Sequence, residues 1–219
     1  LHVITAAARG MAASDRRFPL SVAMATTVVS NLISRQMLGR QMQRVIFDAA
    51  GDESPFVGLS DLPTTRLRLT SENLRAALLA SGSIPLLMEG VRIPGDPGRV
   101  HWDGGMLDYH PDFNFGPGDG LVLYPHFYSY VVPGWFDKAL PWRRARGDNF
   151  RRALLISPSD EFVAALPGGK IPDRRDFYRY ADRERMVLWQ RVMDASTRLG
   201  DELNELILTG RLADRVRPW

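Results

Sequence analysis

The sequence of 219 residues contains no cysteine. This absence excludes a disulfide framework, a thiolate metal site and a cysteine nucleophile. A chain without thiols suits a reducing compartment, so we expect a cytoplasmic location, with peripheral contact at a membrane where local features favour it.

Lysine is also scarce. Of the 28 basic residues only Lys138 and Lys170 are lysines, a bias typical of a GC-rich genome, and the net charge is a mild +3. Attraction to anionic lipid or nucleic acid would therefore depend on local clusters. The clearest cluster, WRRARGDNFRR at 142–152, reads as a solvated loop and carries no recognised binding motif, so we expect no nucleic-acid partner.

Long apolar runs are missing as well. No run reaches the about 18 residues that a membrane-spanning helix needs. The longest weakly polar stretch, PLSVAMATTVVSNLIS at 19–34, reads as a buried helix or as one that touches a membrane.

Short apolar strands alternate with helices along the chain. We expect strands at 1–8, 99–102, 120–127 and 152–159, and helices at 19–44, 71–80 and 182–208. RVIF at 44–47 is either another strand or the end of the first helix. The alternation indicates an α/β layered fold with a largely parallel sheet. No linker divides the chain, so we expect a single domain.

Two helix signals are specific. Thr70 is typical of an N-cap and Gly82 of a stop for the 71–80 helix. The last helix carries a stripe that we expect to face a core. Its members are Met186, Trp189, Met193, Leu203, Leu206 and Ile207.

Asp103 is the first candidate for chemistry. It ends the strand-like RVHW and is followed by Gly104 and Gly105. Strand ends of α/β sheets are where reactive groups are displayed, and a carboxylate there can act as a general base. Asp-Gly is also a common turn pair, so the same residues are explained by a turn alone.

The surroundings of Asp103 add a resemblance. ALLASGSIP at 77–85, the strand that ends in Asp103-Gly104-Gly105, and the following Asp108-Tyr109-His110 together resemble the second half of the patatin-like phospholipase family. The opening LHVITAAARG resembles the family strand that follows the nucleophile helix. The resemblance covers residues 1–125, and 126–219 resemble an extension specific to a bacterial branch.

The resemblance implies a three-layer α/β/α fold and a Ser–Asp dyad, with Asp103 as its acid and Gly104 and Gly105 as the supporting turn. It implies hydrolysis of lipid or small esters without a cofactor or a metal. The Gly-x-Ser-x-Gly nucleophile motif and the preceding glycine-rich loop do not occur in this sequence. Since the chain opens directly in a strand, we expect a fragment whose missing N-terminal part supplies the serine and the oxyanion hole.

An acid with an ordinary pKa of about 4 is a poor base for a hydroxyl. We therefore expect Trp102, Met106 and Leu107 to enclose Asp103 and to raise its basicity. Apolar side chains from the sheet and the 70–80 helix are expected to line an acyl pocket. The chain alone should not hydrolyse esters, whereas the intact parent should. The alternative is a non-catalytic lipid- or partner-binding domain of the same fold.

Other polar residues near Asp103 have less specific patterns. Asp103, Asp108, His110, Asp112 and His126 match no standard metal-ligand spacing. His101 would share a strand face with Asp103, and it reads as a structural histidine. Ser81 and Ser83 read as a helix C-terminal turn rather than as nucleophiles. The aromatic-rich segment 124–142 is either a lipid-facing surface or a loop folded over the core.

Overall fold

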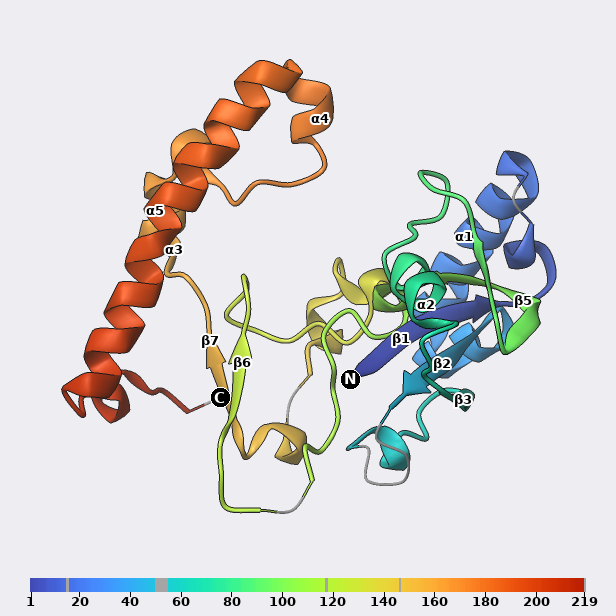
Figure 1. The fold of residues 1–219 in the computed structure, drawn as a ribbon, viewed down its shortest axis with the longest axis horizontal. Helices are drawn as coiled ribbons and strands as arrows, with labels where there is room; N and C mark the ends of the chain where they lie inside the picture. Colours follow the sequence, from blue (N-terminus) through green and yellow to red (C-terminus); the bar gives the residue numbers. More distant parts are fainter. Residues whose placement is uncertain (15, 50–54, 117, 146, 219) are drawn as a thin grey trace. The chain divides into compact units, whose positions relative to one another are not determined.

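The computed structural model describes residues 1–14, 16–49, 55–116, 118–145 and 147–218. Its contacts divide the chain into two units (Figure 1). The first comprises Leu1–Leu121 with Tyr130–Arg152, and the second comprises Val122–Ser129 with Ala153–Trp219. Among the described residues no helix is long and apolar enough to cross a bilayer.

The first unit is built on a five-stranded sheet with the order β3-β2-β1-β5-β4. The strands are β1 (His2–Ala8), β2 (Met42–Asp48), β3 (Thr64–Arg68), β4 (Val91–Ile93) and β5 (Asp96–Asp103). The expected strands at 1–8 and 99–102 are confirmed, and RVIF belongs to β2 rather than to a helix. β3 was not expected; it begins at the end of a Gly-, Asp-, Ser- and Pro-rich segment that was assigned as a loop, and its side chains are only partly buried or exposed.

The expectation of a largely parallel sheet is wrong for this unit. β2 and β3 are parallel, whereas β1 is antiparallel to both β2 and β5, and β4 is antiparallel to β5. The helical excursion between β1 and β2 leaves and re-enters at the same end of the sheet, because the Arg9 N–H donates to the Gln41 carbonyl at 2.8 Å. Alternation of strands and helices therefore did not determine strand direction.

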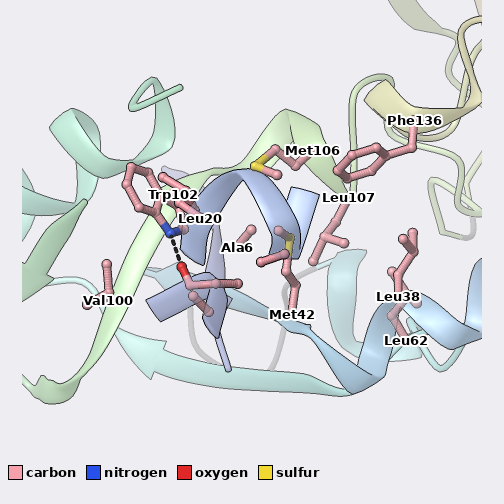
Figure 2. Close-up of a cluster of buried hydrophobic side chains, with 13 residues drawn as sticks. Ala6, Leu20, Leu38, Met42, Leu62, Val100, Trp102, Met106, Leu107 and Phe136 are labelled. Atoms are coloured by element: carbon pink, nitrogen blue, oxygen red, sulfur yellow. Dashed lines mark hydrogen bonds between the residues drawn. The ribbon is translucent and has the colours of Figure 1, made fainter. Parts of the chain in front are cut away.

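One face of the sheet packs against α1 (Arg17–Ile33) and the 3-10 helices η1 (Gly10–Ala13) and η2 (Arg35–Arg40). Figure 2 shows this cluster, in which the Trp102 indole N–H donates to the Ala12 carbonyl at 3.0 Å. Its fully or nearly fully buried members include Ala6, Ala8, Leu20, Leu38, Met42, Val100, Met106, Leu107 and Phe136.

The opposite face packs against α2 (Leu74–Ser81), which lies across β1 and β5 (Figure 1). Ala77 and Ala80 of α2 contact Val3 and Ala7 of β1 in a second buried cluster. Side chains alternate along a strand, so Ala6 and Ala8 face α1 while Val3 and Ala7 face α2. The first unit is thus mixed α/β, with an open sheet that has helices on both sides.

The expected start of α2 is shifted. Thr70 and Asn73 cap a turn reciprocally, because the Thr70 N–H donates to Asn73 Oδ1 at 2.8 Å and the Asn73 N–H to Thr70 Oγ1 at 3.4 Å. The α-helix itself begins at Leu74 and stops before Gly82, as expected.

The second unit contains two parallel strands, β6 (Val122–Pro125) and β7 (Ala153–Ile156). Its helices are α3 (Asp160–Ala165), α4 (Asp176–Arg179) and α5 (Asp182–Leu208). The remaining 3-10 helices of the chain are η4 (Pro55–Gly58), η5 (Gly104–Met106), η6 (Trp135–Asp137), η7 (Pro141–Arg143), η8 (Asp148–Phe150), η9 (Pro167–Gly169) and η10 (Leu212–Arg215).

The bounds of α5 match the expectation, but its predicted core stripe is wrong in part. Met186, Met193 and Ile207 are exposed, whereas Trp189, Leu203 and Leu206 are partly buried. Val192 is the buried residue of this helix. The repeat of apolar residues placed the helix correctly, but it did not show which of its faces has a partner.

Candidate functional site

Asp103 is the last residue of β5 and lies opposite Thr5 of β1 in the sheet register. Its backbone N–H donates to the Ser83 carbonyl at 2.9 Å. The structure therefore brings together two segments that are about twenty residues apart in the sequence, the small-residue end of α2 and the Asp103-Gly104-Gly105 turn.

The two glycines have steric roles in this turn. A Cβ atom at Gly104 would overlap the carbonyl oxygen of Ile4 in β1, so only glycine allows this close approach. A Cβ at Gly105 would lie 3.0 Å from Asp103 Oδ1, the atom that accepts the Gly105 N–H at 2.7 Å. The turn holds the carboxylate in one orientation and also rests on β1.

The carboxyl of Asp103 is half-buried. Burial raises its pKa above the ordinary value, while the Gly105 N–H and the nearby Lys138 ammonium act in the opposite direction. A general base for a hydroxyl requires a raised pKa, because a higher pKa makes the carboxylate a stronger proton acceptor.

The expected enclosure of Asp103 by Trp102, Met106 and Leu107 is wrong. All three side chains belong to the cluster on the α1 side (Figure 2). Trp102 precedes Asp103 in the strand, and neighbouring side chains of a strand leave on opposite faces. Adjacency in the sequence was therefore a poor guide to what surrounds the carboxylate.

Tyr109 and Lys138 lie on the Asp103 side of the turn instead. A Cβ at Gly105 would be 3.6 Å from Tyr109 Cδ2, and Lys138 Nζ is 3.8 Å from the centre of the Tyr109 ring. Sequence reasoning missed Lys138 because it lies 35 residues downstream of Asp103 (138 minus 103). Its rarity as one of two lysines was the only available signal.

Behind the turn lies a buried network of ion pairs. Arg44 of β2 contacts Asp108 through two hydrogen bonds, at 2.7 Å from Nε and 2.6 Å from Nη2, and Asp61 at 2.8 Å. The Asp108 N–H donates in turn to the Gly104 carbonyl at 2.9 Å. The chain that leaves the turn is thereby fixed to β2.

Arg35 extends this network. Its guanidinium pairs with Asp137 at 3.1 Å and donates to the Leu107 carbonyl at 2.5 Å. Burial opposes the ionised form of Asp61, but the hydrogen bonds and charge of Arg44, and then the charge of Arg35, lower its pKa overall. Asp61 is therefore held as a carboxylate by the two guanidinium groups.

The other sequence candidates have structural partners. Ser83 is buried and its hydroxyl donates to the Leu79 carbonyl at 2.9 Å, while the Ser81 hydroxyl donates to the Leu78 carbonyl at 2.8 Å. The His110 Nδ1 accepts the Val132 N–H at 2.8 Å. Among the described residues no group of three or more acids and histidines is placed to hold a metal ion.

His101 lies two residues before Asp103 in β5 and is fully buried. Its Nδ1 is 2.9 Å from Thr5 Oγ1 and its Nε2 is 3.1 Å from Asp96 Oδ2. Burial lowers the pKa of His101, against the influence of Asp96. This polar chain stabilises the pairing of β1 with β5, the two strands that position the turn.

The surface beside the turn is apolar. Leu78 and Leu79 at the end of α2 and Leu86, Leu87 and Met88 after it are all exposed. Leu86 has a left-handed backbone (φ 70°), which is costly for a bulky residue and common at functional sites. The two best-formed hollows of the described residues, of about 520 and 310 Å³, both border α5 and include neither Asp103 nor α2. The acyl pocket stays a prediction.

The aromatic-rich segment 124–142 is divided between the two units. Phe136 is part of the buried cluster of the first unit, whereas Trp142 is exposed. Each of the two interpretations therefore fits only some of its residues.

Comparison with known proteins adds no assignment. No family model matches the chain, and neither a curated protein nor a solved structure is similar to it.

Proposed function

We propose that this chain forms part of a patatin-like serine acyl hydrolase, in which Asp103 accepts the proton of a serine supplied from outside these 219 residues. The observation that carries the proposal is the joint placement of the α2 end and the Asp103 turn, with a carboxyl whose pKa is raised by burial. Neither segment alone would distinguish a catalytic acid from a turn.

The proposed reaction is hydrolysis of a lipid or small ester. The serine oxygen attacks the ester carbonyl while its proton moves to the Asp103 carboxylate. Asp103 then returns this proton to the oxygen of the leaving alcohol as the acyl-enzyme forms. Water hydrolyses the acyl-enzyme, with Asp103 accepting a proton of the water and passing it to the serine oxygen as the carboxylic acid leaves. Donors of an oxyanion hole, also from outside this chain, would each contribute about 2.7–4 kcal/mol to the transition state.

One feature supports the finer assignment of a three-layer patatin-like fold. Buried clusters lie on both faces of the sheet, one with α1 and one with α2. The antiparallel β1 weighs against a simple doubly wound arrangement. We also propose a cytoplasmic protein that contacts membranes peripherally, with no cofactor.

The second candidate function is a non-catalytic lipid- or partner-binding domain. It is favoured by the steric roles of Gly104 and Gly105, which explain the Asp-Gly-Gly sequence as a turn that rests on Ile4. The exposed apolar residues beside the turn would serve either function.

The deciding experiment compares Asp103→Asn with Asp119→Asn in the parent polypeptide that carries this sequence. Asp119 is an exposed acid outside the site and is the matched control. Hydrolysis of a short-chain p-nitrophenyl ester should fall by about 10²–10⁴-fold in the first variant, since that is the usual contribution of a general base, and should stay unchanged in the second.

Retained hydrolysis in Asp103→Asn would refute the dyad. Absence of hydrolysis in the unaltered parent, with its fold intact by circular dichroism, would favour the non-catalytic candidate. The 219-residue chain alone is expected to be inactive.

A further inference from the structure

The distribution of apolar residues between the buried and the exposed face of helix α1 is unusual. Its inner face consists of Leu20, Ala23, Thr27 and Asn31, which are all buried. Its outer face is exposed and mostly apolar, with Phe18, Ala25, Val28, Val29, Leu32 and Ile33 beside the polar Ser21 and Thr26. The more apolar face of the helix is thus the one in contact with solvent.

The inner face is held by specific polar contacts. Asn31 Nδ2 donates to Asp137 Oδ1 at 2.7 Å, and the Thr27 hydroxyl contacts Gln41 Oε1 at 2.5 Å. Arg143 donates to the Asn31 carbonyl at 3.1 Å. These contacts fix the rotation of α1 about its axis, so the outer face cannot turn inward without leaving buried polar groups unpaired.

The outer face is too extensive for scattered surface residues. Phe18 is 81% exposed, Val29 58% and Ile33 70%, and they recur along the helix at spacings that keep them on one side. A continuous apolar stripe of this kind marks an interaction surface. Between Arg17 and Ile33 the helix has no charged residue at all.

The charges around this stripe are predominantly positive. The first 47 residues contain six arginines and a single acid, Asp15. Arg16 and Arg17 are exposed at the start of α1, and Arg40 is exposed in η2 beyond its end. An apolar helix face with exposed arginines at both ends is complementary to a bilayer that carries anionic headgroups.

We propose that the outer face of α1 is a docking surface for anionic membranes. The helix lies in the plane of the interface with Phe18, Val29 and Ile33 among the acyl chains, and with Arg16, Arg17 and Arg40 at the level of the phosphates. It does not span the bilayer. The inference extends the proposed function by naming how the protein reaches a lipid substrate, and it requires no hydrolysis.

The first experiment measures sedimentation of the chain with vesicles of phosphatidylglycerol and phosphatidylcholine, and with vesicles of phosphatidylcholine alone. We expect binding to the anionic vesicles that weakens as salt is raised. The double variant Val29→Ser, Ile33→Ser should bind more weakly by about tenfold or more for each side chain removed. Serine has nearly the helix propensity of valine and isoleucine, so α1 should persist.

A second variant and a matched control locate the surface. Arg16→Gln with Arg17→Gln should lower binding by about fivefold per arginine at low salt. The control is Met186→Ser with Met193→Ser at exposed apolar positions of α5, away from the Asp103 turn, which should bind like the unaltered chain. Circular dichroism and the melting temperature verify the fold of every variant.

A fluorescent label tests insertion directly. Because the chain lacks cysteine, Val29→Cys gives a single labelling site for a nitrobenzoxadiazole probe, and Ser71→Cys, in an exposed turn, gives the reference site. Emission from position 29 should shift to the blue with anionic vesicles and be quenched by spin-labelled lipid, while emission from position 71 should not change.

Three outcomes would overturn the proposal. The first is the absence of binding to anionic vesicles. The second is loss of binding in the α5 control but not in the α1 variant. The third is a change from dimer to monomer in the α1 variant without vesicle binding, which would assign the face to a second copy. A chain that binds vesicles as described, in a parent that hydrolyses no ester, would keep this inference and remove the hydrolase.

Discussion

The two units of the chain are stabilised in different ways. The first buries two clusters on a five-stranded sheet and fixes its turns with ion pairs. The second has a two-stranded sheet and a 27-residue helix, α5, in which Val192 is the buried residue. Stability of the first therefore depends on tertiary packing, whereas α5 depends largely on local helix formation.

This difference matters for function because a catalytic carboxyl must be held in place. Asp103 lies in the first unit, on strands that are fully buried at Ala6, Ala7 and Trp102. We expect substitutions of buried residues to be costly in the first unit and substitutions at exposed positions of α5 to have little effect.

The largest expected effect is at Arg44. Arg44→Ala removes a buried guanidinium and leaves Asp108 and Asp61 without their main partner, so the free energy of unfolding should fall by about 3–5 kcal/mol. Arg198→Ala, an exposed position of α5, should change it by less than about 0.5 kcal/mol. Urea denaturation measures both, and equal losses would mean that the two units do not differ as described.

Glycines provide a second comparison. Gly104→Ala should destabilise the protein by about 1–3 kcal/mol or more, since the added methyl group would overlap the Ile4 carbonyl. Gly200→Ala, in α5 with open space around it, should stabilise by about 0.5–1 kcal/mol because alanine favours a helix. Thermal unfolding of both variants should give shifts of opposite sign, and a neutral Gly104→Ala would disprove the close approach to β1.

The smallest expected change in stability concerns the carboxyls of Asp103 and Asp176. Burial raises the pKa of Asp103, whereas the hydrogen bond from Lys170 leads the lowering of the pKa of Asp176 in the second unit. An acid with a raised native pKa favours folding below its ordinary pKa, about 3.9, and loses that contribution as the pH rises through the raised value. For Asp176 the contribution is present above the ordinary pKa and is lost as the pH falls through the lowered one.

At pH 7, Asp103→Asn should therefore leave the protein equally stable or slightly more stable, by less than about 1 kcal/mol after solvent screening. Asp176→Asn should destabilise it, because the amide keeps one acceptor for the Trp189 and Asp173 N–H groups but loses the ion pair with Lys170 at 2.7 Å. Denaturation at pH 3 and pH 7, with carbon-13 titration of the two carboxyls, checks both signs. The same sign for both variants would contradict the difference in environment.

Local patterns in the sequence predicted the elements well. β1 is a short β-branched run, and α5 has both its apolar repeat and acids in its first turn, so their ranges agree with the structure. β3 was missed because its sequence, TTRLR, is neither continuously apolar nor a clear alternation of apolar and polar residues. Local patterns carry no information on strand direction, which is why the antiparallel β1 was not foreseen.

The site was predicted only in part, for the same reason. Asp103 and its glycines were found because they are contiguous, and so was the α2 end that contacts them. Lys138, Tyr109 and the Arg44 network come together through tertiary contacts that no spacing reveals. For α1 the apolar repeat at Val22, Val29 and Ile33 was visible, yet the buried face is the one with Thr27 and Asn31.

The contact between Gly104 and Ile4 also bears on how the protein is handled. The floor beneath the acidic turn is made by the fourth residue of the chain, and the fifth lies directly across from the acid. A substitution or a chain break in β1 would therefore disturb Asp103, although Ile4 and Asp103 are almost a hundred positions apart. Cleavage next to β1 should be checked before any loss of activity is attributed to the acid itself.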